Sequence, residues 1–142
     1  MAPKTFQIGV KGLIVVNGRV LLLKRADAET GPFWELPGGR MEEGEAIEHT
    51  LRRELDEELP GITEIVIGQV LHAALVPDDA GGLVLLFYRV QANIPRVTIS
   101  AEHLAYTWAS AADILTLPEG IDGAAIQPFT LAAITLALQS EG

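Results

Sequence analysis

Acidic side chains are concentrated in one short stretch of the sequence. Eight of the nineteen aspartates and glutamates lie within residues 42–58. Three of them, Glu54, Glu57 and Glu58, stand at positions i, i+3 and i+4, so their carboxylates would share one face of a helix. Like charges at this spacing cost roughly a few tenths of a kcal/mol per pair. Stability alone would therefore not select this arrangement.

The apolar residues predict that this stretch is helical. Apolar side chains recur at three- and four-residue spacing over residues 45–59. Pro60 and Gly61 end the helix, because proline lacks an amide donor and glycine tolerates a left-handed exit. The acidic triplet then occupies the last turns, where the helix dipole favours cations, and only Arg53 offsets it locally. A solvated charged face is one interpretation, but a site for a hard divalent cation, Mg²⁺ or Mn²⁺, explains the cost better.

Two glycines precede the acidic helix. Gly38 and Gly39 carry no side chain, so the backbone there can approach a ligand closely and direct carbonyls or amides towards it. For the pair alone, a tight turn after Pro37 is the simpler interpretation. A glycine turn that leads into a helix with three carboxylates at its far end is a rarer combination, and it favours metal binding.

Strands and turns surround this helix. A strand at residues 8–16 and a returning strand at residues 19–25 are joined by Asn17-Gly18, which suits the positive φ angles of a tight hairpin. The returning strand is continuously apolar, which indicates burial on both faces. The other predicted elements are loops at 26–32 and 77–82, strands at 62–76, 83–92 and 107–109, a short helix capped by Ser110 and reaching Leu115, and a final helix from Pro128 to Leu138. This order predicts an α/β sandwich around a mixed sheet.

The bulk properties restrict the classes of function. A chain of 142 residues fits one compact domain, so we expect residues 1–142 to form a single domain. The net charge of −9 disfavours nucleic-acid polymers, which are bound by neutralising phosphates with Lys and Arg. The absence of cysteine excludes disulfides and thiolate metal sites. With no apolar run of the roughly 18–20 residues that span a membrane and no signal-type N-terminus, we expect a soluble, cytoplasmic protein without a membrane partner.

The acidic stretch also resembles the signature of a known family. Gly39, five residues, Glu45, seven residues and then residues 53–58 (Arg-Glu-Leu-Asp-Glu-Glu) resemble the Nudix box, Gx5Ex7REUxEExGU, in which U is aliphatic. The lead-in at residues 34–39 and the segment from Glu102 to Trp108 are similar to the family as well. One departure follows the last acid, where the box expects glycine and an aliphatic residue but the chain has Pro60-Gly61. This one-residue insertion changes the helix exit and leaves the ligand spacing intact.

The resemblance implies a fold, a reaction and a set of metal ligands. It implies the Nudix-type α/β/α sandwich of MutT-like pyrophosphohydrolases and Mg²⁺-dependent water attack on the diphosphate linkage of a nucleoside diphosphate derivative. The metal ligands would be Glu54, Glu57 and Glu58, with the carbonyl of Gly38 as a further oxygen. Arg53 would orient a carboxylate. The candidates for its partner are Glu57, one turn on, and Glu45, which would support the loop and helix rather than contact the metal.

The general base and the substrate contacts are less defined. Glu102 is a candidate base, His103 a second one, and Glu54 or Glu57 could serve within the box itself. Lys24 and Arg25 end an apolar strand and could meet substrate phosphates, as could the backbone at Gly39. Aromatic side chains that could stack on a base are Phe33, Phe87 and Tyr88, although core packing is the more common role of such residues.

Alternative functions are consistent with parts of this pattern. An isomerase acting on an isoprenoid diphosphate is disfavoured, since the chain has no cysteine and is short for that group. A non-catalytic Nudix-like module that binds a nucleotide or a partner typically loses acids of the box, and this chain retains them. The final helix is apolar almost all round, so we expect it to be buried or to contact a partner chain. A homodimer is therefore one of the possibilities that the sequence leaves. No loop selects among nucleoside triphosphates, nucleotide sugars, ADP-ribose and dinucleoside polyphosphates.

Overall fold

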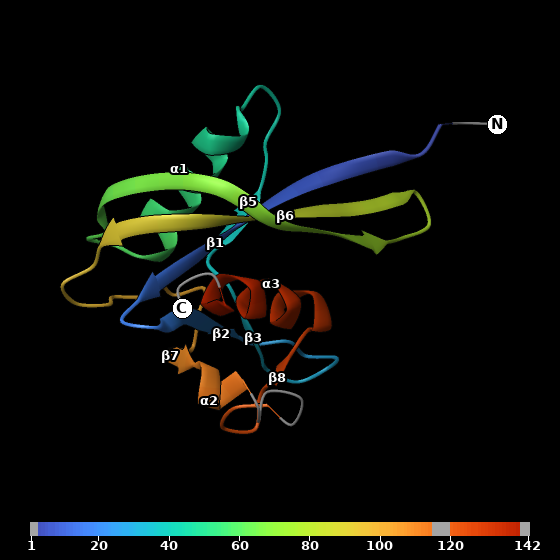
Figure 1. Ribbon diagram of the computed structural model, residues 1–142. Coiled ribbons are helices and arrows are strands. Elements are labelled where there is room, and N and C mark those ends of the chain that lie inside the picture. Colours follow the sequence, from blue (N-terminus) through green and yellow to red (C-terminus); the bar gives the residue numbers. More distant parts are fainter. Residues whose placement is uncertain (1–2, 115–119, 140–142) are drawn as a thin grey trace.

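The computed structural model describes residues 3–114 and 120–139. Figure 1 shows a mixed sheet with helices on its two sides. The elements in chain order are β1 (Thr5–Val16), β2 (Arg19–Arg25), β3 (Phe33–Glu35), β4 (Gly38–Arg40), α1 (Ile47–Glu58), β5 (Thr63–Pro77), β6 (Gly81–Asn93), β7 (Ala105–Ser110), α2 (Ala111–Ile114), β8 (Ala125–Ile126) and α3 (Pro128–Gln139). None of the described helices is long and apolar enough to cross a membrane.

Strand β1 connects the two halves of the sheet. It pairs in parallel with β6 over ten residues and antiparallel with β4, and it turns into β2 through a tight hairpin. The predicted hairpin is confirmed, because Asn17 and Gly18 have φ angles of 52° and 74°. The strand order is β5-β6-β1-β2-β3-β8, with β4 paired to β1 and β7 to β2.

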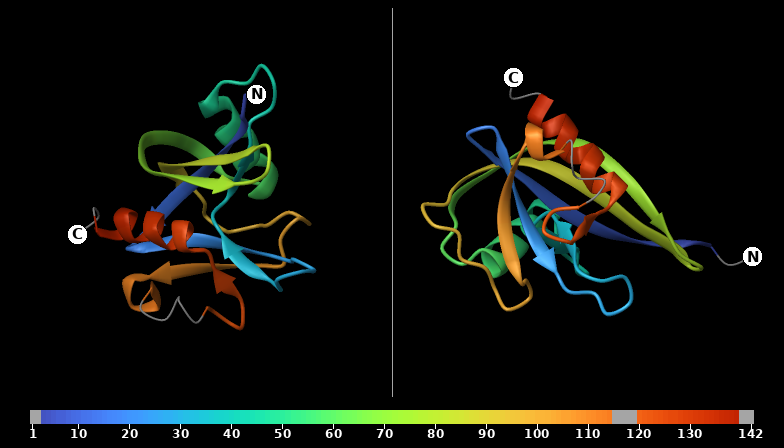
Figure 2. Two further views of the ribbon diagram at one scale, coloured as in Figure 1. Left: turned by 90° about the vertical axis from the view of Figure 1, so that its right-hand side faces the viewer. Right: turned by 90° about the horizontal axis from the view of Figure 1, so that it is seen from below.

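Two apolar cores lie on opposite faces of the sheet, and the helices cover them separately. In β2, Val20 and Leu22 face the α3 core while Leu21 and Leu23 face the α1 core, and all four are fully buried. This alternation confirms that the strand is buried on both faces. Figure 2 (right) shows α1 and α3 on opposite sides of the strands. The predicted α/β sandwich around a mixed sheet is therefore confirmed.

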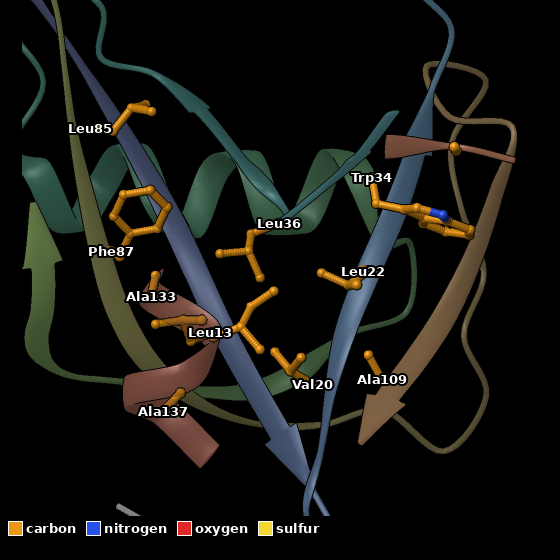
Figure 3. Close-up of a cluster of buried hydrophobic side chains, with 12 residues drawn as sticks. Leu13, Val20, Leu22, Trp34, Leu36, Leu85, Phe87, Ala109, Ala133 and Ala137 are labelled. Atoms are coloured by element: carbon orange, nitrogen blue, oxygen red, sulfur yellow. The ribbon is translucent and has the colours of Figure 1, made fainter. Parts of the chain in front are cut away.

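The α3 core forms where the last helix packs on β5, β1 and β2, and Leu85 and Phe87 of β6 belong to the same cluster. Figure 3 shows Ala133 and Ala137 beside Leu13 and Phe87, with Trp34 farther along the cluster near β2 and β7. The indole nitrogen of Trp34 donates a hydrogen bond to the carbonyl of Ile121 at 2.8 Å. Small residues on α3 let the helix approach the sheet closely, which also positions its first turn beside the mouth of a cleft described below.

The structure corrects some local expectations. Gly38 and Gly39 do not form a turn, because they lie in β4 and pair with Lys11 and Val10 of β1. The acidic helix begins at Ile47 rather than at residue 45, and the short pairing strand β8 was not expected. The capped short helix is present at residues 111–114, whereas Leu115, its expected last residue, lies outside the described residues.

Candidate active site

Arg53 is the centre of a partly buried ion-pair cluster on α1. Its Nε and Nη2 atoms contact the two carboxylate oxygens of Glu45 at 2.7 and 2.8 Å, and its Nη1 contacts Glu54 at 2.8 Å. Glu57 is farther away, with 3.6 Å between its Oε1 and Nη1. Hydrogen bonds from Arg53 and from the amide of Glu42 lower the pKa of Glu45 to about 2. Of the two carboxylates expected to partner Arg53, Glu45 is therefore the closer.

Glu54 lies directly against Gly39. A Cβ atom at Gly39 would stand only 2.3 Å from Cδ of Glu54, so only glycine leaves room for this carboxylate. Burial raises the pKa of Glu54, and its hydrogen bond with Arg53 does not fully compensate for that burial. The glycine of the Nudix-like motif thus makes space for the Glu54 carboxylate across β4.

Glu58 is a buried acid at the end of α1. Its residue is only 1% exposed, and its Oε1 accepts a hydrogen bond from the amide of Gly38 at 2.7 Å. The closest basic nitrogens among the described residues are Nε2 of His103 at 3.9 Å and Nη2 of Arg25 at 4.0 Å. Burial raises the pKa of Glu58 to about 7 despite the hydrogen bond from Gly38. Its charge is therefore poorly neutralised by the protein itself.

The carboxylates around Glu58 fit a divalent cation. Ligand atoms of Glu58, Glu102 and His103 all lie within 4.8 Å of one another. Glu102 is exposed, whereas His103 is buried. The Glu54 side chain is partly buried beside β4. The Glu57 side chain, about one helical turn further on, is 53% exposed. Carboxylate oxygens that are buried and short of positive charge are the ligands that Mg²⁺ and Mn²⁺ take in proteins.

A second network surrounds Glu35, on the other side of Gly38. Its Oε1 contacts Nζ of Lys11 at 3.1 Å, and its Oε2 contacts Nε of Arg25 at 2.6 Å and Nε2 of His103 at 2.9 Å. Burial alone would raise the pKa of Glu35, but the hydrogen bond from His103 and the charge of Lys11 outweigh it and hold the pKa at about 2. Glu35 is therefore ionised at neutral pH, with two cations beside it.

A cleft of about 350 Å³ opens above this network on the α3 side of the sheet. Its walls are largely apolar, and its polar side chains gather near β4 and near the first turn of α3. The lining residues are Gly9, Lys11, Arg25, Phe33, Glu35, Gly38, Gly39, Arg40, Val76, Leu83, Leu85, Phe87, Gln127, Phe129 and Thr130. Gly38 and Gly39 thus contact the acids of α1 and also border the cleft.

The structure brings only some of the expected substrate contacts to this cleft. Arg25, Phe33 and Phe87 line it. Lys24 instead lies over the ring of Trp34, 5.7 Å from its centroid, and is not among the described residues of the cleft wall. Tyr88 packs with the core under α1, on the opposite face of the sheet. Arg25 instead contacts Glu35, which also lines the cleft, at 2.6 Å.

Several residues of the site were not recognised in the sequence. Lys11 is the single charged residue within residues 8–16, and Glu35 stands between Trp34 and Leu36, both of which are buried. An ionisable residue in an otherwise apolar strand is a usable signal, because burial of a charge requires a partner. Arg40, Gln127 and Thr130 carried no comparable signal.

Comparison with known proteins agrees with this geometry. The family model described as NUDIX domain matches residues 5–128. The chain belongs to the Nudix family. The nucleoside triphosphatase NudI of Escherichia coli is 36% identical over 116 residues, which cover 72% of this chain and 81% of that protein. A Mycobacterium tuberculosis protein named “Putative 8-oxo-dGTP diphosphatase 2” is 36% identical over 115 residues, covering 76% of each chain.

Solved structures share the fold of this pyrophosphohydrolase. A MutT Nudix hydrolase from Burkholderia pseudomallei superposes with a TM-score of 0.73 at 28% identity, covering 94% of this chain and 98% of that one. The E. coli ORF135 protein superposes with a TM-score of 0.76 at 22% identity, covering 98% and 93%. The fold, the family and the general activity expected from the sequence are therefore confirmed.

Proposed function

We propose that this Nudix hydrolase uses Mg²⁺, or Mn²⁺ in its place, to hydrolyse the diphosphate linkage of a nucleoside diphosphate derivative. The observation that carries the proposal is the shared border at Gly38 and Gly39. On one side these residues contact the under-neutralised carboxylates of Glu54 and Glu58, and on the other they line the cleft. A diphosphate at this border would lie against the metal-binding acids while its nucleoside occupies the cleft.

We assign the metal ligands to the acids of α1 that the box contains. Glu54, Glu57 and Glu58 supply carboxylate oxygens, and the carbonyl of Gly38 supplies a further one. Bound divalent cations polarise phosphoryl oxygens and stabilise the charge that develops on them. Arg53 does not need to contact the substrate, because its contacts with Glu45 and Glu54 keep the Glu54 carboxylate against Gly39.

We place the general base at Glu102. Its carboxylate is exposed and has an oxygen within 4.8 Å of the Glu58 and His103 ligand atoms, so it can contact both the site and bulk water. A base must lie within hydrogen-bond reach of the attacking water, and an exposed loop acid can move to that position. Glu102 would take a proton from the water as the water attacks phosphorus.

The cleft supports binding of a single nucleoside. Phe33, Phe87 and Phe129 provide apolar surface for a base, and Arg25 provides a cation for a phosphate close to Glu58. A substrate role for Lys24 stays a prediction. Two relatives are named for nucleoside triphosphates, so nucleoside triphosphates, including oxidised ones, are the first candidates, ahead of nucleotide sugars, ADP-ribose and dinucleoside polyphosphates.

The test is a panel of these substrates with Mg²⁺ or Mn²⁺ and with EDTA. We expect release of phosphate, diphosphate or nucleotide from at least one member, and no release with EDTA. Glu58→Gln should abolish turnover, whereas Glu48→Gln, which removes an exposed acid from the first turn of α1, should not. Saturable nucleotide binding without turnover on any member would favour the non-catalytic module instead.

The oligomeric state and the cellular location stay predictions. A homodimer would find an open edge at β5, where Val66, Val70 and Leu75 are 57%, 48% and 53% exposed. Glu64 is the only charged residue of this strand, so two copies of a chain with a net charge of −9 could meet there without strong repulsion. Sedimentation at several protein concentrations tests the dimer, and fractionation of the source cells tests the cytoplasmic location.

A further inference from the structure

His103 lies between the cleft and the metal-binding acids. It is only 5% exposed, and its loop is held by backbone hydrogen bonds from Ser100 to Glu58 at 3.2 Å and from Leu104 to Lys24 at 2.8 Å. Its Nε2 atom is 2.9 Å from Oε2 of Glu35 and 3.9 Å from Oε2 of Glu58. One buried ring nitrogen thus faces a carboxylate of each network.

The hydrogen-bond chemistry fixes what this nitrogen does. The Glu35 carboxylate already accepts from Lys11 on Oε1 and from Arg25 on Oε2, so it acts as an acceptor and Nε2 of His103 carries the hydrogen. The other nitrogen, Nδ1, is buried and has no hydrogen-bond partner among the described residues. In this arrangement Nε2 already donates and Nδ1 is closed off from solvent, which favours Glu102 over His103 as the general base.

We propose that His103 is a positioning residue: its Nε2–H holds the Glu35 carboxylate, and through it Arg25, whose Nη2 lies 4.0 Å from Oε2 of Glu58, in the geometry that binds the cation and the substrate phosphate. The inference rests on the proposed metal-dependent hydrolysis but assigns a role to a residue outside the metal ligands. Glu35 in turn contacts Lys11 and Arg25 on the cleft side. The N–H of His103 therefore helps to fix the positions of Lys11 and Arg25 relative to Glu58 at the end of α1.

Loss of this donor has a defined consequence. Without the N–H, Oε2 of Glu35 keeps Arg25 as its one remaining partner, so the Glu35 carboxylate and the Arg25 side chain, which lies 4.0 Å from Glu58, are held less firmly. Partners that orient metal ligands typically cost about 10- to 100-fold in metal affinity or activity when removed. We expect a loss of this size, in metal affinity as well as in kcat/KM.

The experiment compares two replacements of His103. His103→Leu removes the donor and fills the space, whereas His103→Gln places an amide N–H near the position of Nε2. His49→Leu is the control, because His49 lies on α1 with a side chain that is 67% exposed. Mn²⁺ affinity is measured by electron paramagnetic resonance, and kcat and KM are measured on the best substrate of the panel.

We expect His103→Leu to lose about 10- to 100-fold in Mn²⁺ affinity and His103→Gln to recover most of it, with the control unchanged. Equal affinities in the wild type and both variants would overturn the proposal, and so would equal losses in Leu and Gln. If His103→Leu does not fold, a double-mutant cycle of His103→Gln and Glu35→Gln replaces it, with Mn²⁺ affinity as the measured quantity. Additive losses of affinity would overturn the proposal, and non-additive losses would support it.

The hydrogen position is tested without metal or activity. Long-range ¹H–¹⁵N correlation spectra of the wild type should show hydrogen on Nε2 of His103 and a bare Nδ1. A hydrogen on Nδ1 alone would overturn the proposal even if the enzyme is active. If the wild type hydrolyses substrate and the His103 variants behave like it, the proposed function stands and the role of His103 is wrong. If the wild type binds no Mn²⁺, both the proposed function and the role of His103 are wrong.

Discussion

The Gly39→Ala variant adds one methyl group between β4 and the Glu54 carboxylate. The added Cβ atom would lie 2.3 Å from Cδ of Glu54 and 2.6 Å from each of its oxygens. Gly39 is not among the described glycines with positive φ, so alanine adds no backbone strain there. The perturbation therefore acts on Glu54 and leaves the fold in place.

The size of the effect follows from the overlap. An ordinary carbon contact begins near 3.4 Å, so Cδ of Glu54 must move by at least 1.1 Å, the difference between 3.4 and 2.3 Å. This movement stretches the 2.8 Å contact between Glu54 and Arg53. A misplacement of about 1 Å in a catalytic site costs roughly 100-fold in rate. We expect kcat to fall about 100-fold in Gly39→Ala.

The assay combines turnover with thermal unfolding. Gly68→Ala is the matched control, because Gly68 lies on the edge strand β5, away from the cleft, and its Cβ would come no closer than 3.3 Å to another residue. Alanine for glycine changes stability by about 1 kcal/mol or less where the backbone permits it. Wild-type turnover in Gly39→Ala would refute the steric argument, and an unfolded variant would show that Gly39 is required for the fold instead.

Three further predictions concern other parts of the site. Glu57→Gln should lower turnover by orders of magnitude while the melting temperature of the metal-free protein holds or rises; a clear fall in melting temperature would make this acid structural. The pKa of Glu45 is lowered to about 2 in the folded protein, so the wild type should be more stable than Glu45→Gln above pH 4.5 and should lose this advantage as the pH falls towards about 2. Acid unfolding of both proteins without metal measures the difference. Phe33→Ala should raise KM about 2- to 10-fold, and an unchanged KM would exclude stacking on this ring.

Local patterns predicted the parts of the fold that depend on neighbours in sequence. The Asn17-Gly18 hairpin, the fully buried strand β2 and the end of α1 before Gly61 follow from turn chemistry, apolar runs and helix-breaking residues within a few positions. The spacing of Glu54, Glu57 and Glu58 gave the acidic cluster for the same reason, because a helix places these residues by its own geometry.

Long-range pairing determined what the sequence did not reveal. Gly38 and Gly39 suggest a turn by themselves, yet β1 draws them into a strand by pairing with Lys11 and Val10. Glu35 meets Lys11 across 24 positions of sequence and His103 across 68, distances at which no local pattern operates. The burial of Glu58 is also a tertiary effect, since α1 alone gives no reason for one acid to be buried and Glu57 to be half exposed.

The division of the molecule into two cores has a consequence for how such a protein can diverge. The acids of α1 rest on Leu51, Leu55 and their neighbours on one face, whereas the cleft wall is built from side chains such as Leu83 and Phe129 on the other. Substitutions in the cleft wall therefore change the shape of the cleft without moving the acids of α1. Ancestral duplicates could therefore acquire new substrates through changes on one face alone, while the hydrolytic chemistry stayed constant on the other.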